Sequence, residues 1–490
     1  MKPLPESLYS ARAVREMDRL AVERHGTPVS ELMKRAGATA WRCLRRRWPE
    51  ARRIAVFCGS GHNGGDGYVL AALARRAGAQ VTLLATTAPK PGAALEARQE
   101  FLAAGGTVGE IPVRLPAVDV VVDALLGTGL DKPVAGAFAD AIRLVNAGDA
   151  PVLALDVPSG LNADTGAVMG DAVRATVTIS FLGLKAGLLT GRGRVHAGAL
   201  EFSGLDLPAE GFRDVAPIAT RITADHVRAG LPGREEDAHK GGAGSVLVVG
   251  GNAGMLGAAR LAGEAAYRAG AGFVRVATRA AHAPALAAAC PELLAVAVED
   301  GTVLRNCLAA ADVVAVGPGL GQDEWSRKLW QALCDARAPM VVDADALNLL
   351  AQNPERREDW ILTPHPGEAA RLLGVAARDV QGDRFAAVRA LRDRYGGVVV
   401  LKGSGTIVAG EGKACLCDRG NPGMAVAGMG DVLTGAIAAL RAQGMSALEA
   451  AVAGVFLHAT AGDCAARAGR YGLIASDLLP FLRALRNTPA

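Results

Sequence analysis

The chain has 490 residues, and at about 100–200 residues per domain this length favours two or more domains. Lys and Arg number 53 against 49 for Asp and Glu. A formal net charge of +4 is too small to imply a nucleic-acid or membrane partner. The N-terminal residues lack the apolar centre of a signal peptide, so we expect a cytoplasmic protein. The eight scattered cysteines form no CxxC pair and favour buried thiols over disulfides or zinc ligands.

Short β-like runs alternate with Ala-rich helical patterns along the whole chain. The runs of the first part are RIAVFC, QVTLLAT, VDVVVDALL, APVLALDVP and ATVTISFL, and those of the second are GSVLVVGG, GFVRVAT, ADVVAVGPG, APMVVDADAL, DWILTPHP and GGVVVLKGSGTIVAG. This alternation predicts parallel sheets covered by helices. A stretch rich in Pro and Gly, without a clear period, separates the two parts. We therefore predict an α/β protein with two three-layer domains, residues 1–220 and 221–490.

The first Gly-rich turn, GSGHNGGDG, stands between the run RIAVFC and a helix-like stretch. It formally contains the GxGxxG fingerprint of dinucleotide-binding turns, but no acid follows at the distance expected for a ribose contact. Asn63 and Asp66 instead add polar side chains that can contact a ligand or an ion. Asp66 is alternatively the N-cap of the following helix, a common use of Asp at such a turn.

Two later turns each place an aspartate at the end of a predicted strand. VVDALLGTGLDKP places Asp123 before a Gly-rich loop, and LALDVPSGLNADTG places Asp156 and Ser159 after the next strand. In an open parallel sheet, the loops at the carboxyl ends of neighbouring strands converge on one crevice. We therefore expect Asn63, Asp66 and these three residues to lie together.

These three turns resemble, in order and spacing, the N-terminal domain of NAD(P)H-hydrate epimerases, with His62 where that family usually has an asparagine. The resemblance implies a Rossmann-like domain that interconverts the R and S hydrates of NADH and NADPH. Because the hydrated carbon is a hemiaminal centre that can open and close again, we expect Asp156 to be the catalytic residue that handles the proton. The resemblance also implies a K⁺ ion held by Asn63, Asp123 and Ser159, whose oxygen atoms suit a hard cation. The implied substrate contacts are His62, Asn63, Gly64, Gly65, Asp66, Gly127, Thr128, Gly129, Leu130, Asp131, Lys132, Pro133 and Asp156.

The stretch NPGMAVAGMGDVLTG in the second part combines open backbone with a carboxylate. Gly428 and Gly430 leave N–H groups free at the start of a predicted helix, and Asp431 follows at once. Amide donors beside a carboxylate suit phosphoryl transfer to a hydroxyl, although an Asp in the first turn of a helix also has a purely structural use. TPHPGEAARLL places His365 and Glu368 at another helix start, where Glu368 can order a Mg²⁺ ion through water.

The Gly428–Asp431 segment matches the GxGD motif of the ribokinase-like superfamily. More closely, GGNAGMLGAA, GPGLG, DADALN, LTPHPGE, KGSGT and NPGMAVAGMGD resemble the ADP-dependent NAD(P)H-hydrate dehydratases. The resemblance implies a ribokinase-like domain that binds ADP with Mg²⁺ and uses Asp431 as its catalytic base. The implied hydrate contacts are Ala258, Gly319, His365 and Asp431, and the implied nucleotide contacts are Lys402, Gly403, Ser404, Gly405, Thr406 and Gly430.

Both resemblances together predict a nicotinamide-nucleotide repair enzyme. The first domain would supply the S hydrate that the second dehydrates to NAD(P)H, at the expense of ADP and with release of AMP and phosphate. The alternative is a ribokinase-like small-molecule kinase fused to a non-catalytic nucleotide-binding domain. We expect small-molecule substrates, no nucleic-acid or membrane partner, and a homo-oligomer.

Overall fold

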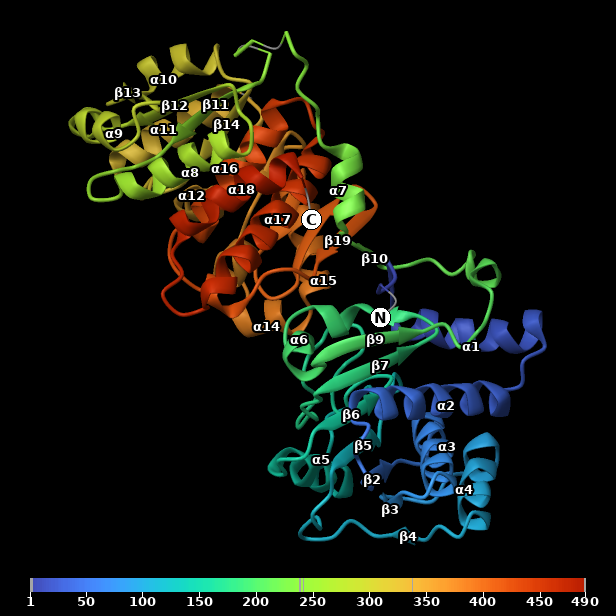
Figure 1. Cartoon of the computed structure of the whole chain (residues 1–490). Helices are drawn as coiled ribbons and strands as arrows, with labels where there is room; N and C mark the ends of the chain where they lie inside the picture. The colour runs from blue at the N-terminus through green and yellow to red at the C-terminus, as the bar shows by residue number, and fades with distance from the viewer. Residues whose placement is uncertain (1–2, 238, 241, 337, 489–490) are drawn as a thin grey trace. The chain divides into compact units, whose positions relative to one another are not determined.

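The computed structural model describes residues 3–488 apart from residues 238, 241 and 337. The chain divides into two compact units, Met1–Thr220 and Arg221–Ala490. Each unit contains a sheet flanked by helices (Figure 1), so the predicted α/β class is confirmed. No helix in the described part of the chain is long and apolar enough to cross a membrane.

The first unit is built on a parallel sheet with strand order β4-β3-β2-β5-β6-β7-β9. Its strands are β2 (Arg53–Cys58), β3 (Gln80–Ala85), β4 (Val108–Gly109), β5 (Val120–Ala124), β6 (Val152–Leu155), β7 (Val177–Phe181) and β9 (Ala199–Ser203). The order reverses between β2 and β5, as in the Rossmann fold, and ligands bind outside the carboxyl ends of strands at such a switch point. The turns after β2 and β5 lie at this point.

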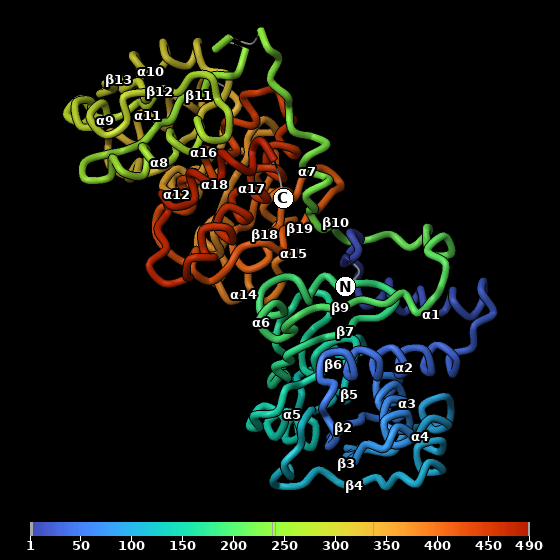
Figure 2. Tube along the Cα trace, viewed as in Figure 1, coloured from blue at the N-terminus to red at the C-terminus, as the bar shows by residue number. Residues whose placement is uncertain are grey.

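Helices cover both faces of this sheet. Ile54 and Val56 of β2 share a core with α2, α3 and α4, whereas Ala55 and Phe57 share a core with α5. Figure 2 shows α2, α3 and α4 together on one side of the strands. The helices are α1 (Ala11–His25), α2 (Val29–Arg47), α3 (His62–Arg76), α4 (Ala93–Ala103), α5 (Ala137–Ala147) and α6 (Gly193–His196). Because both faces are covered, the central strands β5 and β6 are buried along their whole length.

A short strand before α1 fixes where that helix begins. β1 (Ser7–Tyr9) pairs in parallel with β8 (Leu184–Lys185), with Tyr9 opposite Lys185, and antiparallel with β10 (Ala219–Arg221). Ser10 then caps α1, because its hydroxyl accepts a hydrogen bond of 3.1 Å from the Ala13 N–H. The first turn of α1 therefore starts beside Lys185.

The second unit contains strands in the order β13-β12-β11-β14-β15-β16-β17-β18-β19. The strands from β13 to β17 run parallel, and β18 and β19 continue the sheet antiparallel. They are β11 (Ser245–Val249), β12 (Phe273–Thr278), β13 (Leu294–Ala297), β14 (Val313–Val316), β15 (Met340–Val342), β16 (Trp360–Leu362), β17 (Val398–Leu401), β18 (Thr406–Gly410) and β19 (Lys413–Cys417). Val246 and Val248 of β11 share a core with the helices of one face, and Leu247 and Val249, which alternate with them, are also buried. Both faces are therefore covered, as in a three-layer domain.

The helices of the second unit follow most of the strands. They are α7 (Ala224–Gly230), α8 (Leu256–Arg268), α9 (Ala283–Ala289), α10 (Gly301–Leu308), α11 (Glu324–Ala336), α12 (Ala344–Gln352), α13 (Pro366–Leu373), α14 (Ala377–Gly382), α15 (Arg384–Tyr395), α16 (Met429–Ala442), α17 (Ala447–Ala465) and α18 (Leu478–Asn487). Four of them, α8, α16, α17 and α18, form the main apolar core with one face of the sheet.

The structure differs from the sequence predictions in a few elements. β9, β13 and β19 were not predicted, because their runs are short or interrupted by charged residues. α3 begins at His62 with Gly61 as its N-cap, so Asp66 lies in the second turn and the N-cap alternative for Asp66 is wrong. All eight cysteines are free thiols.

Candidate active sites

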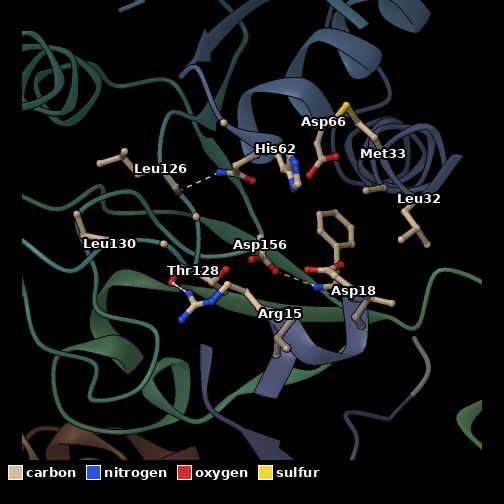
Figure 3. A pocket seen from close by; sticks show the side chains of 18 of the residues that line it. Arg15, Asp18, Leu32, Met33, His62, Asp66, Leu126, Thr128, Leu130 and Asp156 are labelled. Carbon is tan, nitrogen blue, oxygen red and sulfur yellow. Dashed lines mark hydrogen bonds between the residues drawn. The ribbon is translucent and has the colours of Figure 1, made fainter. Parts of the chain in front are cut away.

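The turns after β2, β5 and β6 surround a cavity of about 560 Å³ in the first unit (Figure 3). Nine of the residues predicted from the sequence line it, namely His62, Asn63, Asp66, Gly127, Thr128, Gly129, Leu130, Asp131 and Asp156. Gly64 and Gly65 are not among the lining residues, and serve close packing instead. A Cβ on Gly64 would lie 2.0 Å from the Gly59 oxygen, and one on Gly65 would lie 2.3 Å from Met33 Sδ. Lys132 and Pro133 are exposed and also lie outside the lining residues.

Asp156 lies in this cavity as half of an ion pair. It adopts a φ of 65°, which a non-glycine residue rarely does, directly after β6. Its carboxylate accepts hydrogen bonds from the Lys185 ammonium and, at 3.2 Å, from the Phe181 N–H. Lys185 is fully buried and also donates to the Phe181 carbonyl at 2.8 Å and to Ser180 Oγ at 3.3 Å. The sequence prediction missed Lys185, although a single lysine in the apolar run ISFLGLKAGLL is a signal for a paired buried charge.

Helix α1 contributes two further charged residues that the sequence prediction missed. Arg15 and Asp18 line the cavity, and Arg15 Nη1 donates a hydrogen bond of 3.2 Å to the Thr128 carbonyl. Burial raises the pKa of Asp18 to about 6. Burial also raises the pKa of Asp66 well above its usual value, and the neighbouring Asp156 and Asp18 carboxylates add to this shift.

Asn63, Asp123 and Ser159 meet behind the cavity, as the converging turns predicted. Ser159 donates its hydroxyl to Asp123 Oδ1 at 2.5 Å and its N–H to Oδ2 at 2.8 Å. Asn63 Nδ2 donates to the Leu126 carbonyl at 3.0 Å, while Asn63 Oδ1 is buried without a hydrogen-bond partner among the described residues. Burial of Asp123 raises its pKa to about 6, against the hydrogen bonds from Ser159 that lower it. This is a group of oxygen atoms whose charge and open acceptor suit a cation.

In the second unit, a buried ion pair lies under the first turn of α16. Lys402, at the end of β17, places its ammonium 2.6 Å from Oδ1 of Asp343, which follows β15. Thr434 of α16 donates to Asp343 Oδ2 at 2.9 Å. A Cβ on Gly430 would lie 3.2 Å from Lys402 Nζ and 3.3 Å from Asp343 Oδ2. A glycine at position 430 therefore lets the helix start lie directly on the pair.

Asp431 stands next to this pair without a hydrogen bond to its ammonium. Burial raises the pKa of Asp431 to about 7, and the carboxylate of Asp343 strengthens the shift while Lys402 opposes it. Asp345, which accepts a hydrogen bond of 2.8 Å from the Gly321 N–H, raises the pKa further. Asp431 can therefore accept a proton near neutral pH, as a general base requires.

His365 and Glu368 form a capping box at the start of α13. Nδ1 of His365 accepts hydrogen bonds from the Gly367 N–H at 2.9 Å and the Glu368 N–H at 3.3 Å, and Glu368 Oε2 accepts one of 2.7 Å from the His365 N–H. Burial lowers the pKa of His365, so the ring is neutral at neutral pH. Burial raises the pKa of Glu368 to about 7, and Lys402 Nζ lies 3.8 Å from its carboxylate.

The turn from Lys402 to Thr406 is shaped by an arginine that the sequence prediction missed. Gly403 and Gly405 adopt φ values of 128° and 68°, which other residues rarely adopt. Arg384 is fully buried, and its guanidinium donates to the carbonyls of Leu401 at 3.0 Å, Lys402 at 3.2 Å and Gly405 at 3.4 Å. Arg384 therefore fixes the backbone conformation of the turn through these three hydrogen bonds.

Ala258 and Gly319 lie against each other at the carboxyl edge of the same sheet. Gly319 has a φ of 59°, and a Cβ there would lie 2.5 Å from the Met255 carbonyl and 3.2 Å from Ala258 Cβ. The Gly319 carbonyl accepts a hydrogen bond of 2.7 Å from the Asn252 N–H. The turns after β11 and β14 are thus packed together, as expected for neighbouring parallel strands.

Fold and sites define a two-domain α/β enzyme with a Rossmann-like unit followed by a ribokinase-like unit. Residues 29–187 match the family described as YjeF-related protein N-terminus, and residues 246–482 match the family described as NAD(P)H-hydrate dehydratase. The second unit is similar in structure to a ribokinase-like superfamily protein from Enterococcus faecalis, with 28% identity and a TM-score of 0.52 over 55% of this chain and 95% of that chain.

Two relatives are similar over nearly the whole length. A bifunctional NAD(P)H-hydrate repair enzyme from Coxiella burnetii is 47% identical, covering 98% of this chain and 99% of its own. One from Escherichia coli is 45% identical, covering 99% and 95%. The chain therefore belongs to the family of bifunctional NAD(P)H-hydrate repair enzymes. It is an enzyme with epimerase and dehydratase activities, as predicted, rather than a kinase fused to a non-catalytic domain.

Proposed function

We propose that the first unit interconverts the R and S hydrates of NADH and NADPH, and that the second dehydrates the S hydrate with ADP, releasing AMP and phosphate. The observation that carries this proposal is the pair of aspartates at the two sheet edges. Asp156 lies in a cavity large enough for part of a dinucleotide, and Asp431 lies at a helix start with its pKa near 7. The homo-oligomer and the cytoplasmic location stay predictions.

The chemistry of the hydrate explains why the first unit needs a carboxylate. The hydroxyl is on C6 of the reduced nicotinamide ring, next to the ring nitrogen, so that C6 is a hemiaminal centre and can open and close again. Asp156 would accept the hydroxyl proton as the ring opens and return it after closure on the other face. Lys185 keeps this carboxylate oriented through its hydrogen bond.

A K⁺ ion fits the oxygen atoms behind the cavity. Asn63 Oδ1 is buried and open, and the buried Asp123 carboxylate is satisfied by neutral donors from Ser159 and Leu125. A hard monovalent cation prefers such amide, carboxylate and hydroxyl oxygens. We propose that Asn63, Asp123 and Ser159 hold K⁺, which would fix the turns after β2, β5 and β6 around the substrate.

In the second unit, Asp431 would remove the proton of the hydrate hydroxyl. The terminal phosphoryl group of ADP would then pass to that oxygen, and loss of phosphate together with a ring proton would restore the nicotinamide. The N–H groups of the first turn of α16, whose N-cap Gly428 has no side chain to accept a hydrogen bond from them, would stabilise the negative charge that develops on the transferred group. The backbone of the turn from Lys402 to Thr406 would hold the nucleotide, because the Lys402 ammonium itself is bound to Asp343.

The excess of negative charge around Lys402 suits a Mg²⁺ ion. The carboxylates of Asp343, Glu368 and Asp431 gather around the single ammonium of Lys402. Mg²⁺ is bound in proteins by few carboxylates, by water and by substrate phosphates, and it neutralises the charge on the transferring phosphoryl group. Glu368 would hold it through water.

The test is an assay of the purified chain with racemic NADH hydrate, ADP and Mg²⁺, in which the absorbance of reduced nicotinamide is followed. Complete recovery of NADH, with AMP and phosphate formed in equal amounts, is the expected result. Recovery that stops when the S hydrate is exhausted would refute the epimerase. Accumulation of a stable phosphorylated product would refute the dehydratase in favour of a kinase.

A further inference from the structure

The first helix brings an unassigned carboxylate, that of Asp18, into the cavity of the first unit (Figure 3). α1 is fixed there by two features. β1, directly before it, pairs with the strand that carries Lys185. α1 also packs closely on the turn before Lys185, because a Cβ on Gly183 of that turn would lie 3.0 Å from Val14 Cγ2 and 3.1 Å from Met17 Sδ of the helix. The pairing of β1 and the packing of Val14 and Met17 on the turn before Lys185 therefore fix the position of Asp18.

The cavity contains more carboxylates than buried cations. Asp18, Asp66 and Asp156 line it, and the buried ammonium of Lys185 is bound to Asp156 and to two oxygens of the β7 end. Arg15 lies at the exposed side, where it donates to the Thr128 carbonyl. Like charges in a buried space disfavour ionisation, and the Asp156 carboxylate raises the pKa of both Asp18 and Asp66. Asp156 is paired with the cation, whereas burial raises the pKa of Asp18 and of Asp66.

Asp18 and Asp66 both have a raised pKa, and the pKa of Asp18 lies near neutral pH. Burial raises the pKa of Asp18 to about 6 but raises that of Asp66 well above its usual range, where Asp156 and Asp18 add to the shift. A group that must give up a proton and regain it in one catalytic cycle works best when its pKa is near the working pH. Asp18 meets this requirement.

We propose that Asp18 is a further catalytic residue of the epimerisation, the general acid that protonates the ring nitrogen while Asp156 acts as the general base. The proposal rests on the proposed function of the first unit. Asp18 belongs to α1 and Asp156 to the turn after β6, so the two carboxyl groups would approach a bound substrate from two different elements that line one cavity.

The proton inventory of this step balances. Asp156 takes the proton of the C6 hydroxyl, the carbon–oxygen double bond of an aldehyde forms, and the C6–N1 bond breaks with its electron pair going to N1. Asp18 gives its proton to N1, which leaves an open-chain enamine and an aldehyde. After rotation about the C5–C6 bond, N1 attacks the other face of the aldehyde and returns its proton to Asp18, while the oxygen regains its proton from Asp156. No oxidant, reductant or further reactant is needed.

The first test compares Asp18→Asn with the wild type on the R hydrate, with dehydration of the S hydrate by the same chain as an internal measure of intact protein. Loss of a general acid should lower kcat/KM for epimerisation by about 10²–10⁴-fold and leave dehydration of the S hydrate unchanged. Glu16→Gln is the matched control, because Glu16 is on the same helix but exposed and paired with Arg19. Epimerisation by Asp18→Asn at the wild-type rate would overturn the proposal. A wild type that fails to convert the R hydrate would refute the epimerase itself.

The second test separates proton donation from a structural role. The groups that face Asp18 are Arg15 of α1, His62 and Asp66 of α3, Asp156 after β6 and Lys185 of β8. Because Asp18 must be protonated at the start, wild-type kcat/KM should fall as the pH rises through about 6. Asp18→Asn should lack this fall, and added formate should restore activity to Asp18→Ala. A fall that persists in Asp18→Asn, or an Asp18→Ala enzyme that formate does not restore, would overturn the assignment.

Discussion

Both units place a buried lysine beside an aspartate at the carboxyl edge of a parallel sheet, but the two pairs lie differently with respect to the proposed base. In the first unit the paired aspartate, Asp156, itself lines the cavity. In the second unit Lys402 is bound to Asp343, and the proposed base, Asp431, lies beside the pair. Lys402 therefore opposes the rise in the pKa of Asp431 without cancelling it. The comparison teaches that the same kind of ion pair can include the proposed base or can lie beside a base whose pKa is near neutral pH.

The largest expected effect comes from removing the unpaired base. Asp431→Asn should lower dehydration of the S hydrate by about 10²–10⁴-fold, because an amide cannot take up the hydroxyl proton. ADP binding should persist, since the backbone of the Lys402 turn is unchanged. Asp225→Asn is the control, because Asp225 also lies in the first turn of a helix, α7, but is exposed. Dehydration close to the wild-type rate in Asp431→Asn would exclude Asp431 as the base.

Replacing Lys402 tests how much its ion pair with Asp343 contributes to the stability of the second unit. Lys402→Met leaves Asp343 buried beneath α16 without its cation, and breaking a buried pair in this way costs about 3–5 kcal/mol. We expect the free energy of unfolding of the second unit to fall by that amount in urea titrations. Lys413→Met, on the exposed side of β19, should change it little. Equal stabilities of the two variants would show that the Lys402 pair has no structural role.

Replacing Lys185 should lower the rate of epimerisation in the first unit. Lys185→Met leaves Asp156 without its hydrogen-bonded cation, and the misplacement of a catalytic group by about 1 Å can cost about 100-fold in rate. Epimerisation of the R hydrate should fall by about that factor. Dehydration of the S hydrate should be unchanged, because it takes place in the second unit. Stopped assays on the separate R and S hydrates measure both activities in one preparation.

The pH dependence of dehydration distinguishes a paired from an unpaired base. Burial and neighbouring carboxylates raise the pKa of Asp431 to about 7, and a base works only when ionised. The value of kcat/KM for the S hydrate should therefore rise with pH and level off above about 7. A midpoint near the ordinary value of an aspartate would mean that Lys402 or a bound cation pairs with Asp431 directly.

The smallest expected effect is the stabilisation of the first unit by the K⁺ ion proposed to bind Asn63, Asp123 and Ser159. At a K⁺ concentration of 100 times its dissociation constant, binding should stabilise the first unit by about 2.7 kcal/mol. Thermal unfolding in KCl and in choline chloride measures this difference. Asn63→Leu should abolish it, while Asn146→Leu should retain it, because Asn146 also bonds a backbone carbonyl, that of Ala172, but lies at the end of α5. If KCl still stabilises the Asn63→Leu variant, the K⁺ ion binds at another place in the protein.

Much of each site could be predicted because the sequence pattern carries it locally. The apolar runs predict the parallel strands, and parallel strands bring their carboxyl-end turns to one edge, so Asp123 and Asp156 could be placed from sequence alone. Asp431 could be placed because it follows a Gly-rich turn at the start of a predicted helix. Lys185, Asp343 and Arg384 could not be assigned roles. Their partners lie in other strands and turns, and a single charged residue in an apolar stretch does not state which group it meets.

The sequence by itself determined the two α/β units, the order of their turns and the family to which the chain belongs, because strand periodicity and glycine-rich turns are short-range properties of the chain. Only the tertiary structure decided which charges meet. The contact of α1 with the turn before Lys185 brings Asp18 into the cavity, and the close approach at Gly430 sets α16 on the Lys402 pair. Burial and the distance between charges set the pKa of each carboxylate, and both are properties of the folded chain.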